Sequence, residues 1–159
     1  KSSCGTGSPS SHLKTSTMAS FLPPDFGYVC GIAVATFVVD GYMASKVMSA
    51  RKKYNVQYPK LYAEAGDKNG EAFNCVQRGH QNCIENLPKF TLFLLLGGLE
   101  HPLTSAICGA VYLAGKVVYF NGYSTGDPKK RVYGSFSYFG LFGLIGCTAS
   151  LGLKCLGFI

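Results

Sequence analysis

Apolar residues fill four stretches of this chain, and polar or basic segments separate them. The first stretch, 26–47, contains a single acid, Asp40, and ends at a run of basic residues. Because about twenty apolar residues span a bilayer as a helix, this stretch predicts a membrane helix. The second stretch, 71–99, contains Pro88, which removes a backbone donor and predicts a kinked, interrupted helix.

Two further helices are expected at 103–119 and 132–153. The tight link 100–102 joins the second helix to the third. The segments 54–70 and 122–130 contain Pro and Gly and are expected to be loops. This order predicts an all-α integral membrane protein with four transmembrane helices in an up-down-up-down bundle.

Composition supports a membrane protein, because only 14% of the residues are charged, against about 25% in typical soluble domains. The formal charge is +7, but the basic residues cluster at 51–53 and 129–131 rather than along an aromatic-interleaved helix face. This pattern argues against nucleic-acid binding. Both clusters lie beside apolar stretches, so the positive-inside rule predicts cytosolic basic loops and both termini on the opposite side.

The ends of the chain and its cysteines add little chemistry. Residues 1–20 are rich in Ser and Thr and are expected to form a disordered extension, with Met18 a candidate natural start, before a domain at 21–159. Most of the seven cysteines lie among apolar residues and are expected to pack as small hydrophobes; Cys155 is a candidate S-acylation site. The three histidines show no metal-ligand spacing.

A polar stripe runs along the second helix. It is formed by Asn74, Arg78, Asn82 and Glu85, and it is widened by Gln77 and Gln81. Spacings of three and four residues stack side chains on one helical face. Such a stripe in a spanning helix must face protein, water or ligand. Arg78 and Glu85 are two turns apart, so each is expected to find its partner on another helix.

The third helix repeats this pattern with Tyr112, Lys116, Tyr119 and Tyr123. Arg51 and Arg131 are expected at the same membrane face. Arginine binds carboxylates with two parallel hydrogen bonds, and Glu85 suits an ammonium group. The site therefore predicts a small zwitterion with more than one carboxylate, a description that glutathione fits. Alternatively, these ionic groups only hold the bundle together.

Three segments together resemble one family. The run 78–88, RGHQNCIENLP, resembles the R-x-x-x-N-x-x-E-x-x-P signature of the membrane-associated proteins in eicosanoid and glutathione metabolism. Residues 49–54 resemble the end of that family's first helix, and 111–123 resemble its third. The run 50–64 is most similar to the type-three microsomal glutathione S-transferases.

The resemblance implies a homotrimer with glutathione bound as co-substrate between neighbouring subunits. The glutathione-binding residues that it implies are Arg51, Arg78, Asn82, Glu85, Lys116, Tyr119 and Tyr123. A basic residue at the start of the fourth helix would stabilise the thiolate. An ungapped match gives Lys130, while a shift of one residue gives Arg131, which we prefer because arginine keeps its charge in a partly dry site.

The implied function is a glutathione-dependent transferase and lipid-hydroperoxide peroxidase acting on lipophilic electrophiles, including leukotriene-C synthase-like conjugation. No metal is expected. The alternative is a non-catalytic lipid-binding protein of the lipoxygenase-activating type. The endoplasmic reticulum membrane is the expected location, and the outer mitochondrial membrane is the second candidate.

Three residues depart from the pattern of the leukotriene-C synthase relatives. His80 stands where they carry glutamine, Asn86 stands where they carry tyrosine, and Lys116 replaces an arginine. All three residues are polar and able to bind a ligand. His80 is a candidate general base, although its position predicts that it points away from the face of Arg78.

Overall fold

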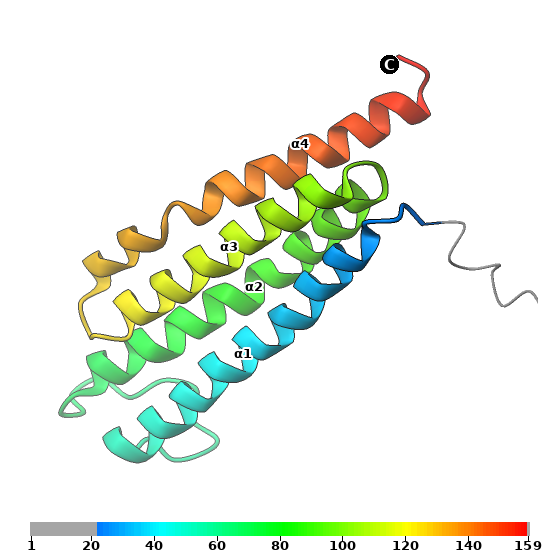
Figure 1. The fold of residues 1–159 in the computed structure, drawn as a ribbon. Helices are drawn as coiled ribbons and strands as arrows, with labels where there is room; N and C mark the ends of the chain where they lie inside the picture. Colours follow the sequence, from blue (N-terminus) through cyan, green and yellow to red (C-terminus); the bar gives the residue numbers. More distant parts are fainter. Residues whose placement is uncertain (1–21, 159) are drawn as a thin grey trace, which may run out of the picture.

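The computed structural model describes residues 22–158, and the regular structure in this range is helical. The elements are α1 (Phe26–Tyr54), α2 (Gly70–Glu100), α3 (Pro102–Tyr123), the 3-10 helix η1 (Pro128–Gly134) and α4 (Ser137–Cys155). The four α-helices lie side by side in an elongated bundle (Figure 1). The expected helical fold is confirmed. The predicted extension 1–20 lies outside the described residues.

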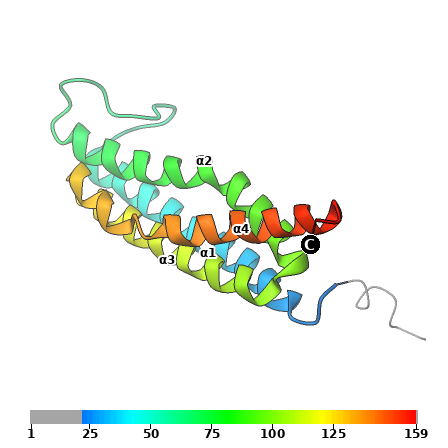
Figure 2. The same cartoon turned by 90° about the horizontal axis from the view of Figure 1, so that it is seen from above.

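Three of these helices, α1, α3 and α4, are long and apolar enough to cross a membrane. Helix α2 lies along the same bundle (Figure 2) and is the longest of the four, with 31 residues. Its first half carries the polar stripe, which lowers its hydropathy. The structure therefore supports a membrane protein with several spans, and the fourth span stays a prediction.

Two features of the helices differ from those predicted. Helix α2 runs through Pro88 to Glu100 without a break, because its packing against the other three helices offsets the cost of proline inside a helix. The basic segment before α4 forms η1, where the Asp127 carboxylate accepts a hydrogen bond from the Lys129 N–H at 3.0 Å. The sequence had suggested that Arg131 lies at the start of the fourth helix. The structure instead places it in η1.

The core consists of two apolar clusters, one toward each end of the bundle. The first includes Met43, Val47, Phe73, Val76 and Phe120, and the second includes Val29, Phe90, Leu94, Tyr112 and Leu144. In the second cluster the rings of Phe90 and Tyr112 are stacked, with centroids 4.2 Å apart. Large apolar side chains also cover the outside of the bundle, as expected of a surface that faces lipid or another subunit.

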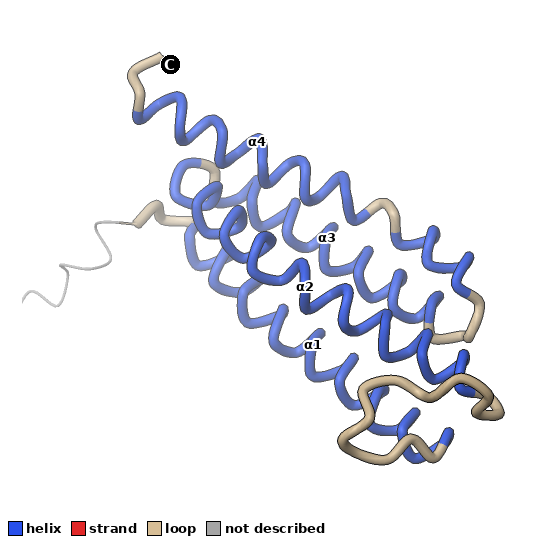
Figure 3. Tube along the Cα trace, turned by 180° about the vertical axis from the view of Figure 1, so that it is seen from behind, coloured by secondary structure: helices blue, strands red, loops and turns tan. Residues whose placement is uncertain are grey.

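The α1–α2 loop and the α3–η1 connection lie at the same end of the bundle, shown in tan in Figure 3. The link at the opposite end is short, because α2 ends at Glu100 and α3 begins at Pro102. This arrangement brings the C-terminal ends of α1 and α3, the N-terminal part of α2 and all of η1 together. The residues of the predicted site come from these four segments.

Candidate functional site

A cleft of about 310 Å³ opens where α2, α3 and η1 meet the start of α4. Four of its lining residues belong to the predicted site, namely Asn82, Lys116, Tyr119 and Arg131. The sequence analysis did not foresee the others, which include Ser135, Ser137 and Tyr138. We call this space the inner cleft.

Lys116 is the buried cation of the inner cleft, with 8% of its surface exposed. Its Nζ donates a hydrogen bond to Oδ1 of Asn82 at 3.2 Å. The ammonium group also lies 5.2 Å from the ring centroid of Tyr119, a distance at which the π-face attracts a cation. Because Lys116 occupies the amide oxygen, the NH₂ group of Asn82 remains as the donor for an anionic ligand.

Two close backbone approaches place η1 against α3. A Cβ atom at Gly122 would lie 2.5 Å from the carbonyl oxygen of Lys130, and one at Gly134 would lie 2.5 Å from that of Gly115. Real Cβ atoms do not come so close, so these positions need glycine. Their contacts bring Arg131 to the inner cleft.

The basic pair in η1 is divided between two environments. The guanidinium carbon of Arg131 lies 5.8 Å from the ring centroid of Tyr123, and Arg131 lines the inner cleft. Both side chains are exposed, but Lys130 is not among the residues that line this cleft. The structure therefore places Arg131, and not Lys130, at the inner cleft.

A second space of about 500 Å³, the outer cleft, adjoins the loop end of α2. Two residues of the predicted site, Arg78 and Tyr123, line it, together with Tyr62, Glu71, Asn74 and Cys75. The ring of Tyr123 packs edge-on against that of Tyr119, with centroids 5.8 Å apart. This aromatic pair connects the two clefts.

Arg78 pairs within its own helix. Its Nη1 lies 2.8 Å from Oε1 of Glu85, and both side chains are nearly half exposed. The expectation that each would find its partner on another helix is therefore wrong. Two long side chains on one face can reach across two turns. Arg78 lines the outer cleft, whereas Glu85 is not among the lining residues of either cleft.

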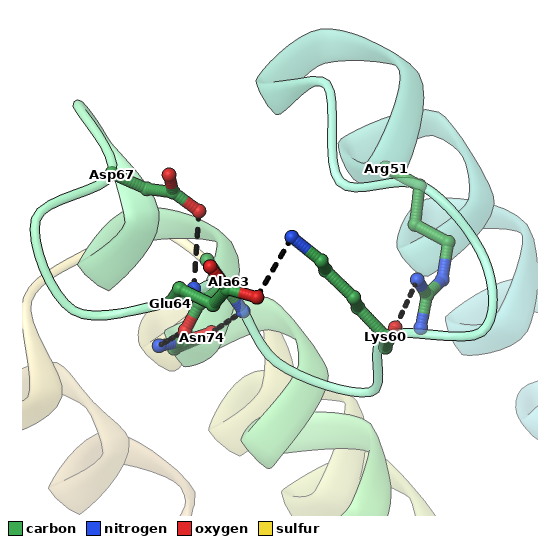
Figure 4. A network of polar contacts seen from close by, with 6 residues as sticks. All are labelled: Arg51, Lys60, Ala63, Glu64, Asp67 and Asn74. Carbon is green, nitrogen blue, oxygen red and sulfur yellow. Dashed lines mark hydrogen bonds and ion pairs between the residues drawn. The ribbon is translucent and has the colours of Figure 1, made fainter.

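Arg51 lies apart from these residues within the protomer. Its buried guanidinium donates a hydrogen bond to the Lys60 carbonyl oxygen at 2.7 Å, as Figure 4 shows. It also lies 4.6 Å from the ring centroid of Tyr58 and 5.3 Å from that of Phe73. Its visible role is to hold the α1–α2 loop.

Two further polar groups lie near the stripe. The phenol of Tyr62 donates a hydrogen bond to Oε1 of Gln81; no spacing rule marks a tyrosine in an irregular loop. His80 Nε2 lies 2.9 Å from Oδ1 of Asp40 on α1, so its ring faces α1 and not the inner cleft. Among residues 22–158 there is no group of three or more metal-ligating side chains.

Comparison with known proteins gives the same family as the sequence signature. The model of the MAPEG family, the membrane-associated proteins in eicosanoid and glutathione metabolism, matches residues 29–150. Human microsomal glutathione S-transferase 2 is 31% identical over 126 residues, which are 79% of this chain and 81% of that protein. Leukotriene C4 synthase from Bos taurus is 26% identical over 126 residues, 79% of each chain. The mouse leukotriene C4 synthase is 27% identical over 123 residues, 77% of each chain.

Proposed function

Because this chain belongs to the MAPEG family and is a multi-pass membrane protein, we propose that it is a membrane glutathione transferase. The observation that carries the proposal is the inner cleft, where Asn82, Lys116, Tyr119 and Arg131 meet. Two cations, one amide and one phenol in a partly buried space suit a small anionic thiol. The relatives named glutathione S-transferase and leukotriene C4 synthase support the same conclusion.

The proposed ligand extends from the inner cleft into the outer cleft. Arg78, next to the aromatic pair Tyr119 and Tyr123, would hold a carboxylate of glutathione. Glu85, which lies 2.8 Å from Arg78, would meet the ammonium group. Lys116 would act through Asn82 and add positive charge behind it. We further propose that Arg51 completes the site from a neighbouring subunit, since it lies apart from the clefts of its own protomer.

The proposed reaction is nucleophilic attack by the glutathione thiolate. A free thiol has a pKa of about 8.5, and an adjacent cation lowers it. Arg131 beside the sulfur would therefore raise the fraction of thiolate at neutral pH, with Lys130 the alternative. Attack on an epoxide forms a carbon–sulfur bond and breaks a ring carbon–oxygen bond, and the resulting alkoxide takes up a proton. Attack on an aryl halide forms the same kind of bond and expels halide. Attack on a lipid hydroperoxide breaks the oxygen–oxygen bond and gives a sulfenic acid and the lipid alcohol, and a second glutathione then displaces water to form the disulfide.

The proposed electrophile is lipophilic and reaches the sulfur from the membrane. Tyr138 at the edge of the inner cleft is followed along α4 by the exposed side chains of Phe139 and Phe142. This apolar surface would guide a lipid toward the thiolate. We propose a homotrimer in the endoplasmic reticulum membrane, with the electrophile held between subunits, and the outer mitochondrial membrane as the alternative location.

The first test is glutathione-dependent turnover of the detergent-purified full chain. A lipid hydroperoxide and a model aryl halide are assayed side by side, together with equilibrium binding of glutathione. Conjugation supports the transferase, and reduction of the hydroperoxide supports the peroxidase. Binding of glutathione without either reaction would mean that the thiol is not activated. Binding of lipid without glutathione would favour the non-catalytic lipid-binding alternative.

The second test separates the two basic residues of η1. Arg131→Ala is expected to lower turnover by about 100-fold, which corresponds to about 2.7 kcal/mol of lost transition-state stabilisation, while glutathione still binds. The rise of turnover with pH should move toward the pKa of the free thiol. Lys130→Ala is the matched variant one residue away and should retain most activity. Full activity in both variants would refute a cationic partner for the thiolate.

A further inference from the structure

The segment 60–64 of the α1–α2 loop is held against the helices at two points. At the first, buried Arg51 donates a hydrogen bond to the Lys60 carbonyl oxygen at 2.7 Å. At the second, the side chain of Asn74 on α2 pairs with both backbone groups of Ala63. It accepts from the Ala63 N–H at 2.8 Å and donates to the carbonyl oxygen at 3.4 Å (Figure 4).

Tyr62 lies between these two anchors, and this fixes where its side chain can go. Its phenol reaches α2 and donates a hydrogen bond to Oε1 of Gln81. The side chain is half-buried and lines the outer cleft together with Arg78 and Tyr123. A tyrosine from an irregular loop thus lines the outer cleft together with residues of the helices α2 and α3.

Arg78 and the two tyrosines of this wall have the chemistry of a carboxylate site, and Glu71 lines another part of the same cleft. Arg78 supplies guanidinium N–H groups, and the hydroxyls of Tyr62 and Tyr123, which line the same cleft, can each donate or accept a hydrogen bond. A phenol has one donor and two lone pairs. The Tyr62 hydroxyl can therefore turn its hydrogen from Gln81 to a bound anion, while the amide of Gln81 rotates to donate back to the phenol oxygen.

We propose that Tyr62 is a further ligand-binding residue, which holds a carboxylate of glutathione together with Arg78 in the outer cleft. This inference rests on the proposed function and adds a residue from outside the helices to the site. It also gives Arg51 and Asn74 a positioning role within the protomer, because they fix the backbone on either side of Tyr62.

The test is equilibrium binding of glutathione to the detergent-purified full chain and to Tyr62→Phe. Loss of one hydrogen bond to a charged group is expected to raise the Kd about tenfold. The thermal unfolding midpoint should stay within about 2 °C of the wild-type value. Tyr58→Phe is the matched control, since Tyr58 lies on the same loop and packs its ring on Arg51; its Kd should not change.

Two analogues separate direct contact from an indirect effect. Glutathione ethyl ester caps the glycyl carboxylate, and 4-aminobutyryl-cysteinyl-glycine lacks the carboxylate of the γ-glutamyl end. If Tyr62 binds a carboxylate, the tenfold effect disappears with one of the two analogues and identifies that carboxylate. An equal effect on all three ligands would overturn direct contact, as would an unchanged Kd for glutathione. If the wild-type chain binds no glutathione, the proposed function fails before this question is reached.

Discussion

His80 Nε2 lies 2.9 Å from Oδ1 of Asp40, and this contact joins α2 to α1 through ionisable groups within apolar surroundings. The imidazole is buried, while the Asp40 side chain is 41% exposed. Ionisable groups within a membrane-spanning helix are costly unless they are paired. The pair explains why a single acid is tolerated in α1. It also directs His80 away from the inner cleft, which makes the histidine a poor general base for a ligand there.

The Asp40–His80 pair is expected to stabilise the bundle. Asp40→Leu should lower the free energy of unfolding by about 1–3 kcal/mol, because it leaves a buried imidazole nitrogen without its partner. Asp40→Asn is the control, since the amide oxygen can still accept a hydrogen bond, and it should cost less. Thermal unfolding in detergent measures both. An Asp40→Leu variant as stable as the wild type would show that the pair adds no net stability.

Lys116 is expected to contribute to binding through Asn82. Lys116→Met keeps the length of the side chain and removes the hydrogen bond at 3.2 Å, so the Kd of glutathione should rise about tenfold. Lys116→Arg restores a cation and should recover much of the affinity. Titration calorimetry checks both variants. Equal affinities of wild type and Lys116→Met would exclude this role.

Close packing of α4 on α3 is expected to depend on Gly140. A Cβ atom there would lie 2.7 Å from the backbone nitrogen of Tyr112, whereas nothing lies within 4 Å of one at Gly146. Gly140→Ala should therefore destabilise the bundle by about 1–3 kcal/mol. Gly146→Ala, on the same helix, should be neutral or slightly stabilising, because alanine favours the helix. Unfolding midpoints of the two variants in one detergent give the comparison.

The α1–α2 loop is expected to loosen when Arg51 is removed. Arg51→Met loses the hydrogen bond to Lys60 and the cation–π contact with Tyr58, so chymotrypsin should cleave the loop several-fold faster after its exposed Leu61. Lys52→Met is the matched control, because Lys52 is the next residue along the helix and its side chain is exposed. Equal cleavage rates in the two variants would contradict the anchoring role.

The sequence alone predicted the helices and the helical face that carries the candidate site. Apolar stretches of membrane length indicate helices whatever their neighbours are, and spacings of three and four residues placed Arg78, Asn82 and Glu85 on one face of α2. The structure confirms the helical fold and brings Asn82 together with Lys116 and Arg131. The helical fold and this grouping could be predicted because helix periodicity is a local property of the chain, and the roles of these residues stay predictions.

The tertiary structure decided which polar groups meet. The pairing of Arg78 with Glu85 depends on the rotamers of two long side chains, and the position of Arg131 depends on the close approach of η1 to α3. The path of the irregular α1–α2 loop decides two further contacts. It lets Arg51 donate a hydrogen bond to the loop, and it places Tyr62 on the wall of the outer cleft. Residue spacing does not encode such a path, because contacts between distant parts of the chain determine it.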